Sequence, residues 1–369
     1  MLNRPTDLQR RVESLLGELV ESGAETGLQV AVVHEGDVVV DAVAGLADPR
    51  TSTPVSADTL FFAASTGKGV AASVAHTLVE RRALHYDQRV ADVWPEFAAH
   101  GKDCVTLRDV LLHTSGVPGL WPQITPDDLG DWDRVCAFIA DQPPWWPPGT
   151  ATGYHALTFG FVLGELVRRA TGRTLADTLR EEIAAPLGVT DELHFGVPDE
   201  LLSRVARQGP DGAAPPPPEP GSPLDRAVPA GVRPTAAFAN RPDVLRADIP
   251  SQATMSARAV ARMYAALLGQ VDGVELVSGE RLTSMAAPAF SGTDQVMGFP
   301  TTTALGYIPA RFGTTGSRPG TTFGWIGSNG TAAYADIDSG VAVAVMRNRI
   351  VGDLSTVAAL DRIVAETFG

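Results

Sequence analysis

The sequence predicts an α+β fold in which an antiparallel sheet, flanked by N- and C-terminal helices, is interrupted by an inserted all-helical subdomain. Two observations indicate this class: paired runs of β-branched residues occur at both ends of the chain, and helical periodicity dominates the middle. The 369 residues, 44% of them hydrophobic and 20% charged, suffice for one large globular core. We therefore expect a single domain over 1–369, with an α/β part at about 1–75 and 300–369 and a helical part at about 76–299.

The N-terminal end predicts one helix and one hairpin. Apolar residues recur every three or four positions over 6–22, the stripe of an amphipathic helix, at Leu8, Val12, Leu15, Leu16 and Leu19. β-Branched runs at 28–34 and 37–45 are separated by Glu35-Gly36, a two-residue turn of hairpin type. This end therefore predicts two antiparallel strands behind a helix.

The C-terminal end mirrors it. Strands are expected at 331–337 and 340–348 around Asp338-Ser339, and a helix over 354–368 closes the chain. Between the two ends, helical patterns occupy 68–83, 106–112, 131–141, 156–171, 174–185 and 256–268. Residues 208–234 carry the run Pro215 to Pro218 and several glycines, so we expect a stiff surface loop that is neither helix nor central strand.

Charge and cysteine content exclude several classes of function. The chain has 29 Lys and Arg against 43 Asp and Glu, a formal charge of −14, so a nucleic-acid partner is not expected. Cys104 and Cys136 are too few for a disulfide scaffold or a structural zinc site.

Charges interrupt the first 16 residues, and no stretch of 18 apolar residues occurs, so we expect a cytoplasmic protein with no membrane segment. The oligomeric state is not predicted.

The first motif that carries chemistry is Ser65-Thr66-Gly67-Lys68. It follows a short apolar run and opens a helical pattern, so Ser65 and Lys68 are expected on one face, one turn apart. A serine hydroxyl becomes a nucleophile when a base removes its proton, and a half-buried lysine is pushed towards the neutral form. The alternative is a serine that caps a helix, followed by a lysine that faces solvent.

Phosphate-binding glycine loops and the common metallopeptidase and cofactor motifs are absent, so no metal or cofactor is expected.

Further motifs follow Ser-x-x-Lys in a set order. They are Leu-His-Thr-Ser-Gly at 112–116, Pro148-Gly149 with a tyrosine shortly after, Thr171-Gly172 and Pro186-Leu187-Gly188. With this series the sequence resembles the serine β-lactamase and penicillin-binding-protein superfamily, in particular its class C-like branch of family VIII esterases, D-aminopeptidases and transesterases. The resemblance spans nearly the whole chain. It implies a β-lactamase-like fold and a serine nucleophile, Ser65.

The resemblance also implies roles for Tyr154, His155 and Ala156. They occupy the place of the family's Tyr-x-Asn motif, so Tyr154 is expected to assist proton transfer, with a phenol pKa lowered by the Lys68 charge. Ala156 departs from the motif, because the asparagine amide that binds the lysine and the substrate is missing. His155 is either a polar substitute for that amide or a solvent-facing side chain. His113 is expected to be structural and to tie a helix end to a loop.

The third family motif is placed on Trp325-Ile326-Gly327, similar to the Trp-x-Gly variant of esterases in this branch. By this alignment the backbone N–H groups of Ser65 and Ser328 form the oxyanion hole, and Gly327 lets the strand approach the substrate. The family motif has a cation at the position of Trp325, so the indole would present an apolar surface to the substrate instead. The alternative is that Trp325 is an ordinary core residue. The residues expected to bind substrate are Trp325, Ile326, Gly327, His155, Ala156 and Trp121.

These residues predict a serine hydrolase that acts on a small-molecule ester, with Ser65 as nucleophile and Lys68 and Tyr154 as general base and acid. An acyltransferase of secondary metabolism would use the same acyl-enzyme. A D-amino-acid amidase or peptidase, a weak β-lactamase and a non-catalytic binding protein on the same fold remain alternatives.

Overall fold

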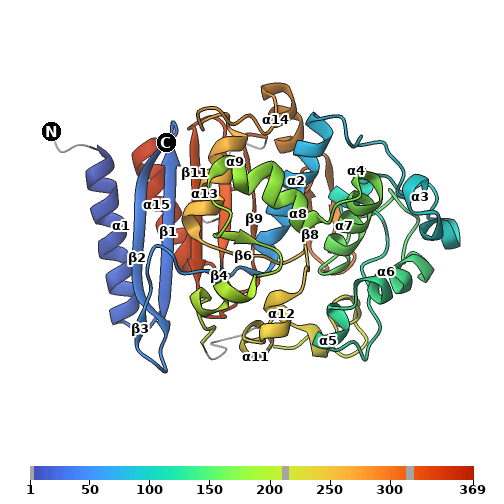
Figure 1. The fold of residues 1–369 in the computed structure, drawn as a ribbon, viewed down its shortest axis with the longest axis horizontal. Helices are drawn as coiled ribbons and strands as arrows, with labels where there is room; N and C mark the ends of the chain where they lie inside the picture. The colour runs from blue at the N-terminus through green and yellow to red at the C-terminus, as the bar shows by residue number, and fades with distance from the viewer. Residues whose placement is uncertain (1–3, 210–215, 313–319) are drawn as a thin grey trace.

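The computed structural model describes residues 4–209, 216–312 and 320–369. Its centre is a six-stranded antiparallel sheet of order β3-β2-β1-β11-β10-β9, in which strands from the two ends of the chain lie side by side (Figure 1). The strands are β1 Gly27–His34, β2 Asp37–Asp48, β3 Thr53–Pro54, β9 Thr322–Ile326, β10 Ala332–Asp336 and β11 Val341–Arg347. Both predicted hairpins, and the sheet that they share, are confirmed.

The central strand β1 shows how the sequence divides the core. Successive side chains of a strand point to opposite faces of the sheet. Leu28, Val30 and Val32 lie in one apolar cluster, whereas Ala31 and Val33 lie in the other. The sheet is therefore covered on both faces.

The terminal helices α1 (Arg4–Glu21) and α15 (Ser355–Phe368) pack together on one face (Figure 1). Val12, Leu16 and Leu360 are buried there. The opposite face is covered by α13 (Ala257–Leu267), which contacts β1, β10 and β11.

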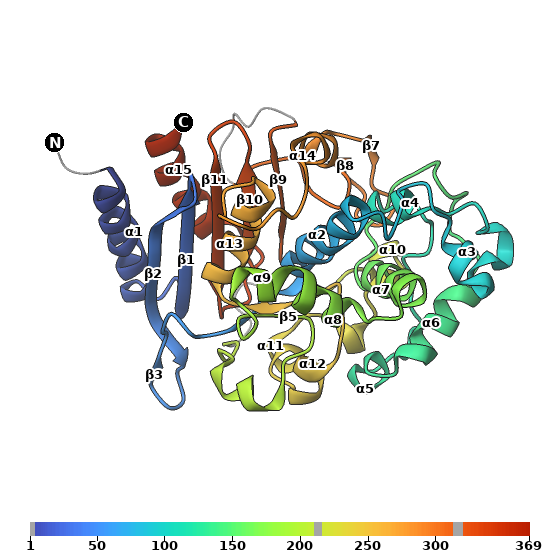
Figure 2. The same cartoon turned by 45° about the horizontal axis from the view of Figure 1, so that its top comes forward.

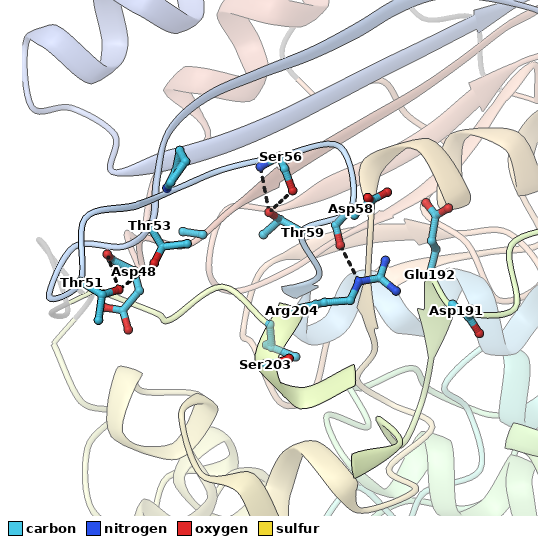
Figure 3. A pocket seen from close by; sticks show the side chains of 13 residues that line it. Asp48, Thr51, Thr53, Ser56, Asp58, Thr59, Asp191, Glu192, Ser203 and Arg204 are labelled. Carbon is cyan, nitrogen blue, oxygen red and sulfur yellow. Dashed lines mark hydrogen bonds between the residues drawn. The ribbon is translucent and has the colours of Figure 1, made fainter. Parts of the chain in front are cut away.

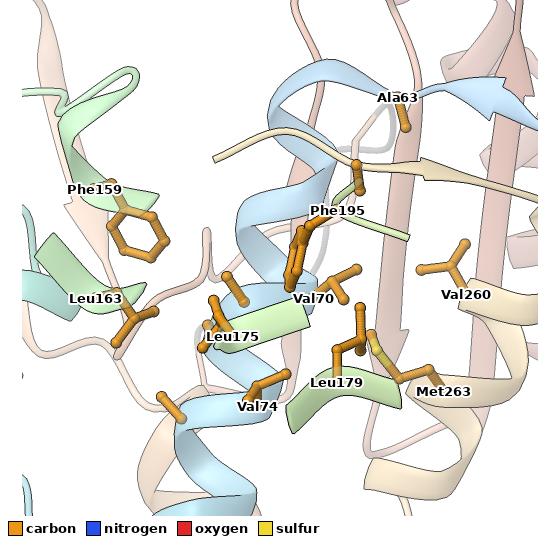
Figure 4. Packing of buried hydrophobic residues seen from close by; sticks show 14 of the residues in the cluster. Ala63, Val70, Val74, Phe159, Leu163, Leu175, Leu179, Phe195, Val260 and Met263 are labelled. Carbon is orange, nitrogen blue, oxygen red and sulfur yellow. The ribbon is translucent and has the colours of Figure 1, made fainter. Parts of the chain in front are cut away.

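Helix α2 (Gly67–Glu80) lies between the sheet and the remaining helices and is buried from its first residue to Val79. Figure 4 shows Val70 and Val74 of this helix among side chains of its neighbours α7 (Thr158–Thr171), α8 (Leu175–Leu179) and α13. Because α2 is enclosed on all sides, the residues at its start are held in fixed positions.

The other elements are short and connect these layers (Figure 2). They are β4 Phe61–Phe62, α3 Val90–Val93, η2 Pro95–Gly101, α4 Leu107–Leu111, α5 Pro126–Leu129, α6 Trp132–Asp141, η3 Arg180–Ala184, α9 Ala185–Leu187, β5 Leu193–His194, η4 Asp199–Arg204, α10 Pro223–Ala227, η5 Ala230–Val232, α11 Ala236–Ala239, α12 Pro242–Arg246, β6 Thr254–Met255, α14 Gly279–Ala286, β7 Phe290–Thr293 and β8 Pro300–Thr303.

Three expectations about the middle of the chain are wrong. The range 76–299 is not all helical, because it contains β5, β6 and β7, and its α13 covers the main sheet. The helix expected over 174–185 is divided, since a π-helical turn, η3, follows α8. The loop expected at 208–234 contains α10, which Ser222 caps and which tolerates Pro223 in its first turn; residues 210–215, including Pro215, lie outside the described residues.

Candidate active site

Ser65 lies in a single 3₁₀ turn, η1 (Ala64–Thr66), that leads directly into α2. The residue before it, Ala64, has a φ of 44°, in the left-handed region that non-glycine residues rarely adopt. The turn is fixed at its base, where the N–H of Ala63 donates to the carbonyl of Ala253 at 2.8 Å. Ser65 is partly exposed, so its hydroxyl is held on a strained and accessible turn.

Lys68 follows one turn later, and its side chain is completely buried. Its Nζ lies 2.6 Å from the carbonyl oxygen of Ala156, 3.2 Å from that of Ser251 and 3.0 Å from Ser65 Oγ. Burial lowers the pKa of Lys68 well below its ordinary value of 10.5. In the neutral form an amine has two N–H groups and one lone pair, so with its N–H groups bound to the two carbonyls, the lone pair would face the Ser65 hydroxyl.

Tyr154 contacts the same oxygen, with its hydroxyl 2.6 Å from Ser65 Oγ. Burial, with a smaller contribution from the charge of Asp294, raises the pKa of Tyr154 to about 12. Hydrogen bonds from Ser65 and from the Trp325 indole act in the opposite direction on this pKa. The expectation that the Lys68 charge lowers the Tyr154 pKa is wrong, because burial of the phenol raises this pKa. The phenol therefore holds its proton at neutral pH and is able to donate it.

Two buried histidines hold the loop that carries Tyr154. His155 Nδ1 donates to the carbonyl of Gly153 at 2.6 Å, and its Nε2 accepts from the N–H of Val117 at 3.0 Å. The N–H of His155 in turn donates to His113 Nδ1 at 3.1 Å. Burial lowers the pKa of His155 to about 4, so the ring is neutral. His155 thus neither faces solvent nor replaces the missing amide, whereas His113 has the structural role expected of it.

Ala156 contributes through its backbone. The family's asparagine amide is absent at this position, and the carbonyl of Ala156 itself accepts the 2.6 Å hydrogen bond from Lys68. The lysine is therefore oriented without a side chain at 156.

The turn after β9 is fastened to the chain just before Ser65. Asn329 Nδ2 donates to the carbonyl of Phe62 at 2.7 Å, and Thr331 Oγ1 donates to that of Ala63 at 2.8 Å. All four groups are buried. These bonds bring the end of β9 against the nucleophile turn.

Gly327 and Ser328 lie in this contact. A Cβ on Gly327 would stand 2.6 Å from the carbonyl oxygen of Ala63, so only glycine allows the two segments to approach this closely. Ser328 follows in the exposed turn, and its backbone N–H has no hydrogen-bond partner in the described part of the chain. An unpaired backbone N–H is the kind of donor that an oxyanion hole requires.

The two residues before Gly327 face opposite sides of the sheet. Trp325 is 4% exposed, with its ring centroid 5.6 Å from that of His113, and its hydrogen bond to Tyr154 places it in the site. Ile326 packs into the cluster under α1 and α15, so its side chain is directed away from Ser65. The expectation that Ile326 binds substrate through its side chain is therefore wrong.

Trp121, a further residue expected to bind substrate, packs against helix α6. Its ring contacts Phe138 on α6 at 4.9 Å between centroids, and the Arg134 guanidinium lies 5.1 Å above it. Trp146 is the tryptophan that packs against the Tyr154 loop, with its ring 5.9 Å from that of His155.

Two groups of the site were missed by sequence reasoning. The carbonyl of Ser251 binds Lys68 from 183 residues away, and Asp294 Oδ1 accepts the N–H of Tyr154 at 3.1 Å from 140 residues away. The sequence around Asp294 indicates a turn, with Gly298 close behind. Nothing in it shows which segment this turn contacts.

A cavity of about 720 Å³ lies apart from these residues (Figure 3). Its lining includes Asp48, Asp58, Asp191 and Glu192, with Arg204 among them, and none of the residues around Ser65. Within residues 4–209, 216–312 and 320–369, no cluster of side chains suits a metal ion. Over the same ranges, no helix has both the length and the apolar character that a membrane span requires.

Comparison with known proteins agrees with this geometry. The model of the β-lactamase family matches residues 12–366. The chain belongs to the β-lactamase family. The esterase/beta-lactamase LipL of Mycobacterium tuberculosis is 34% identical over 361 residues, which cover 89% of this chain and 78% of LipL. Esterase EstB of Burkholderia gladioli is 31% identical over 50% of this chain and 51% of its own.

Solved structures of this family are similar over the whole chain. A family VIII carboxylesterase has a TM-score of 0.89 with 31% identity and covers 98% of this chain and 97% of its own. A penicillin-binding-protein homologue from Caulobacter crescentus has a TM-score of 0.86 with 34% identity, covering 98% of both chains. The named esterases among these β-lactamase-family relatives identify the chain as an enzyme.

Proposed function

We propose that this β-lactamase-family enzyme is a serine esterase that hydrolyses small-molecule esters through an acyl-enzyme on Ser65. One observation carries the proposal: Ser65 Oγ lies 3.0 Å from a buried amine, Lys68 Nζ, and 2.6 Å from a protonated phenol, Tyr154. A base and an acid of these kinds are what acyl transfer from an ester requires. The esterase names of LipL, EstB and the family VIII carboxylesterase support it.

Acylation begins when Ser65 Oγ attacks the ester carbonyl. The lone pair of Lys68 takes the serine proton, and the backbone N–H groups of Ser65 and Ser328 stabilise the oxyanion. When the carbon–oxygen bond to the alcohol breaks, Tyr154 donates its proton to the departing oxygen. The products are the free alcohol, the acyl-enzyme, a Lys68 ammonium and a Tyr154 phenolate.

Deacylation reverses the proton transfers. The Tyr154 phenolate takes a proton from water as the water oxygen attacks the acyl carbon. When the bond to Ser65 breaks, the Lys68 ammonium returns its proton to the serine oxygen. The carboxylic acid leaves, and all three side chains regain their starting protonation states.

The surroundings favour an uncharged ester. Trp325 presents an indole to the site where relatives with a cation would bind a substrate carboxylate, and a carboxylate that lost water there would have no charged partner. The loop that contacts Tyr154 exposes Met297 and Phe299, which are 37% and 50% exposed. We therefore expect neutral acyl esters to react faster than penicillins or peptides with a free carboxylate.

The test is intact-protein mass spectrometry after brief mixing with a p-nitrophenyl acyl ester, with p-nitrophenol release followed in parallel. We expect an acyl adduct in the wild type and neither adduct nor turnover in Ser65→Ala. Absence of both signals in the wild type would contradict the proposal and favour a binding protein on this fold.

Addition of an alcohol or an amine then separates hydrolysis from transfer. A hydrolase releases the acid at an unchanged rate, whereas a transferase forms the new ester or amide at the expense of the acid. Amide substrates with the same acyl group test the amidase alternative.

A further inference from the structure

The hairpin of β7 and β8 stands apart from the main sheet as a two-stranded ribbon, and its tip touches the Tyr154 loop (Figure 2). An isolated two-stranded hairpin has little stability of its own. Two backbone hydrogen bonds close its tip. The N–H of Asp294 donates to the carbonyl of Phe299 at 2.9 Å, and the N–H of Gly298 donates to the carbonyl of Asp294 at 2.8 Å. The tip is therefore a defined loop with Asp294 at its base.

The Asp294 carboxylate joins this tip to the active site. Its Oδ1 accepts three backbone N–H groups, from Val296 and Met297 at 2.8 Å and from Tyr154 at 3.1 Å. Asp294 is buried, with 7% of the residue exposed. A carboxylate that accepts several N–H groups makes charge-assisted bonds, which are stronger than bonds between neutral groups. One oxygen therefore fixes both the shape of the tip and the backbone position of Tyr154.

A second bond ties the same two segments. The N–H of Gln295 donates to the carbonyl of Thr152 at 2.9 Å. With the Asp294 bond, it holds the tip against two positions of the loop that ends in the catalytic phenol. The Tyr154 hydroxyl must stay 2.6 Å from Ser65 Oγ, so a shift of this loop would change the geometry of proton transfer.

We infer that Asp294 is a positioning residue for the reaction: its carboxylate anchors the β7–β8 tip to the Tyr154 backbone and thereby holds the phenol against Ser65. It acts through Tyr154 and touches neither Ser65 nor the substrate's reacting atoms. The inference rests on the proposed esterase function.

The charge of Asp294 supplies a readout that a merely structural role would not move. The titratable groups that face Tyr154 are Lys68, His113 and Asp294. Burial lowers the pKa values of Lys68 and His113 and so disfavours their charged forms, whereas the Asp294 carboxylate raises the pKa of Tyr154. Removal of this charge should lower that pKa. The basic limb of the pH profile, where Tyr154 loses its proton, should then move to lower pH.

The experiment compares Asp294→Asn, Asp294→Ala and Gln295→Ala. The asparagine retains an oxygen for the N–H groups but no charge, so we expect most of the kcat and a basic limb displaced to lower pH. The alanine loses the anchor, and we expect kcat to fall about tenfold to a hundredfold with KM nearly unchanged. Gln295→Ala leaves every Asp294 bond intact and should match the wild type in both kcat and pH profile.

Wild-type kcat and pH profile in both Asp294 variants would overturn the inference. If Asp294→Ala does not fold, Asp294→Asn decides it: an unmoved basic limb would contradict the role. Ester turnover that depends on Ser65 in the wild type tests the proposed function separately, so the two failures are distinguishable.

Discussion

The chain has two lysines, and their surroundings differ in a way that suits one to catalysis and the other to a structural role. Both side chains are completely buried, and both Nζ atoms bond to backbone carbonyls. Lys102 bonds to three carbonyls, of Ala99, Ala140 and Gln142, at 2.8, 3.0 and 2.5 Å. Lys68 bonds to two carbonyls and to the Ser65 hydroxyl.

The surroundings also shift the pKa values of the two amines to different extents. Three carbonyls satisfy the three N–H groups of an ammonium, and the charge of Asp141 opposes the lowering of the Lys102 pKa by burial. No such charge opposes burial at Lys68, whose pKa falls further. Lys102 therefore ties η2 to the end of α6, whereas burial disfavours the charged form of Lys68 beside Ser65.

The largest effect is expected from Lys68→Met. Loss of the base should lower kcat/KM for ester hydrolysis by about a thousandfold or more while the protein stays folded. Steady-state kinetics with circular dichroism of both proteins measures this. Lys102→Met is the matched control and should retain wild-type kcat/KM; equal losses in the two variants would break the distinction between the lysines.

Tyr154→Phe should have the next largest effect, a fall in kcat of about a hundredfold on alkyl esters. The phenol protonates the leaving oxygen, so its loss should matter less when that oxygen is a good leaving group. We expect a smaller fall with p-nitrophenyl esters than with ethyl esters of the same acid. An identical fall with both would show that Tyr154 is not the acid for the alcohol.

Lys102→Met should act on stability alone. It leaves three buried carbonyls without donors, so we expect the free energy of unfolding to fall by about 1–3 kcal/mol. Denaturant unfolding monitored by tryptophan fluorescence gives this value. Unchanged stability would indicate that the three carbonyls do not depend on this amine.

The smallest effect is a pH dependence of stability at Lys68. Burial lowers the pKa of Lys68 in the folded protein, whereas the unfolded chain binds this proton up to the ordinary pKa of 10.5. The free energy of unfolding due to this group therefore rises with pH between the lowered pKa and 10.5. Lys68→Met removes this dependence. The free energy of unfolding of this variant should therefore exceed that of the wild type near neutral pH, and the difference should shrink as pH approaches 10.5. A difference that stays constant with pH would indicate that Lys68 is charged in the folded protein.

The parts of this arrangement that the sequence predicted are those set by local spacing. Ser65 and Lys68 are one turn apart, and the order of the motifs predicted that Tyr154 joins them, as the 2.6 Å contact to Ser65 shows. The two backbone carbonyls that bind Lys68, those of Ala156 and Ser251, were not predicted, because every residue type has a carbonyl.

Electrostatics was the second limit. The expected direction of the Tyr154 pKa was wrong, since the sequence does not show how completely the phenol is buried. The hydrogen bond from Tyr154 to Asp294 spans 140 residues and depends on the fold as a whole.

The most direct test of a neutral Lys68 is nuclear magnetic resonance of protein labelled with ¹³C at the lysine side chains. With two lysines in the chain, the spectrum contains two Cε signals, and Lys68→Met and Lys102→Met assign them. We predict that at neutral pH Lys68 gives the chemical shift of a free amine and Lys102 that of an ammonium. Two ammonium signals, with no titration of Lys68 until pH values well above neutral, would contradict its role as the base.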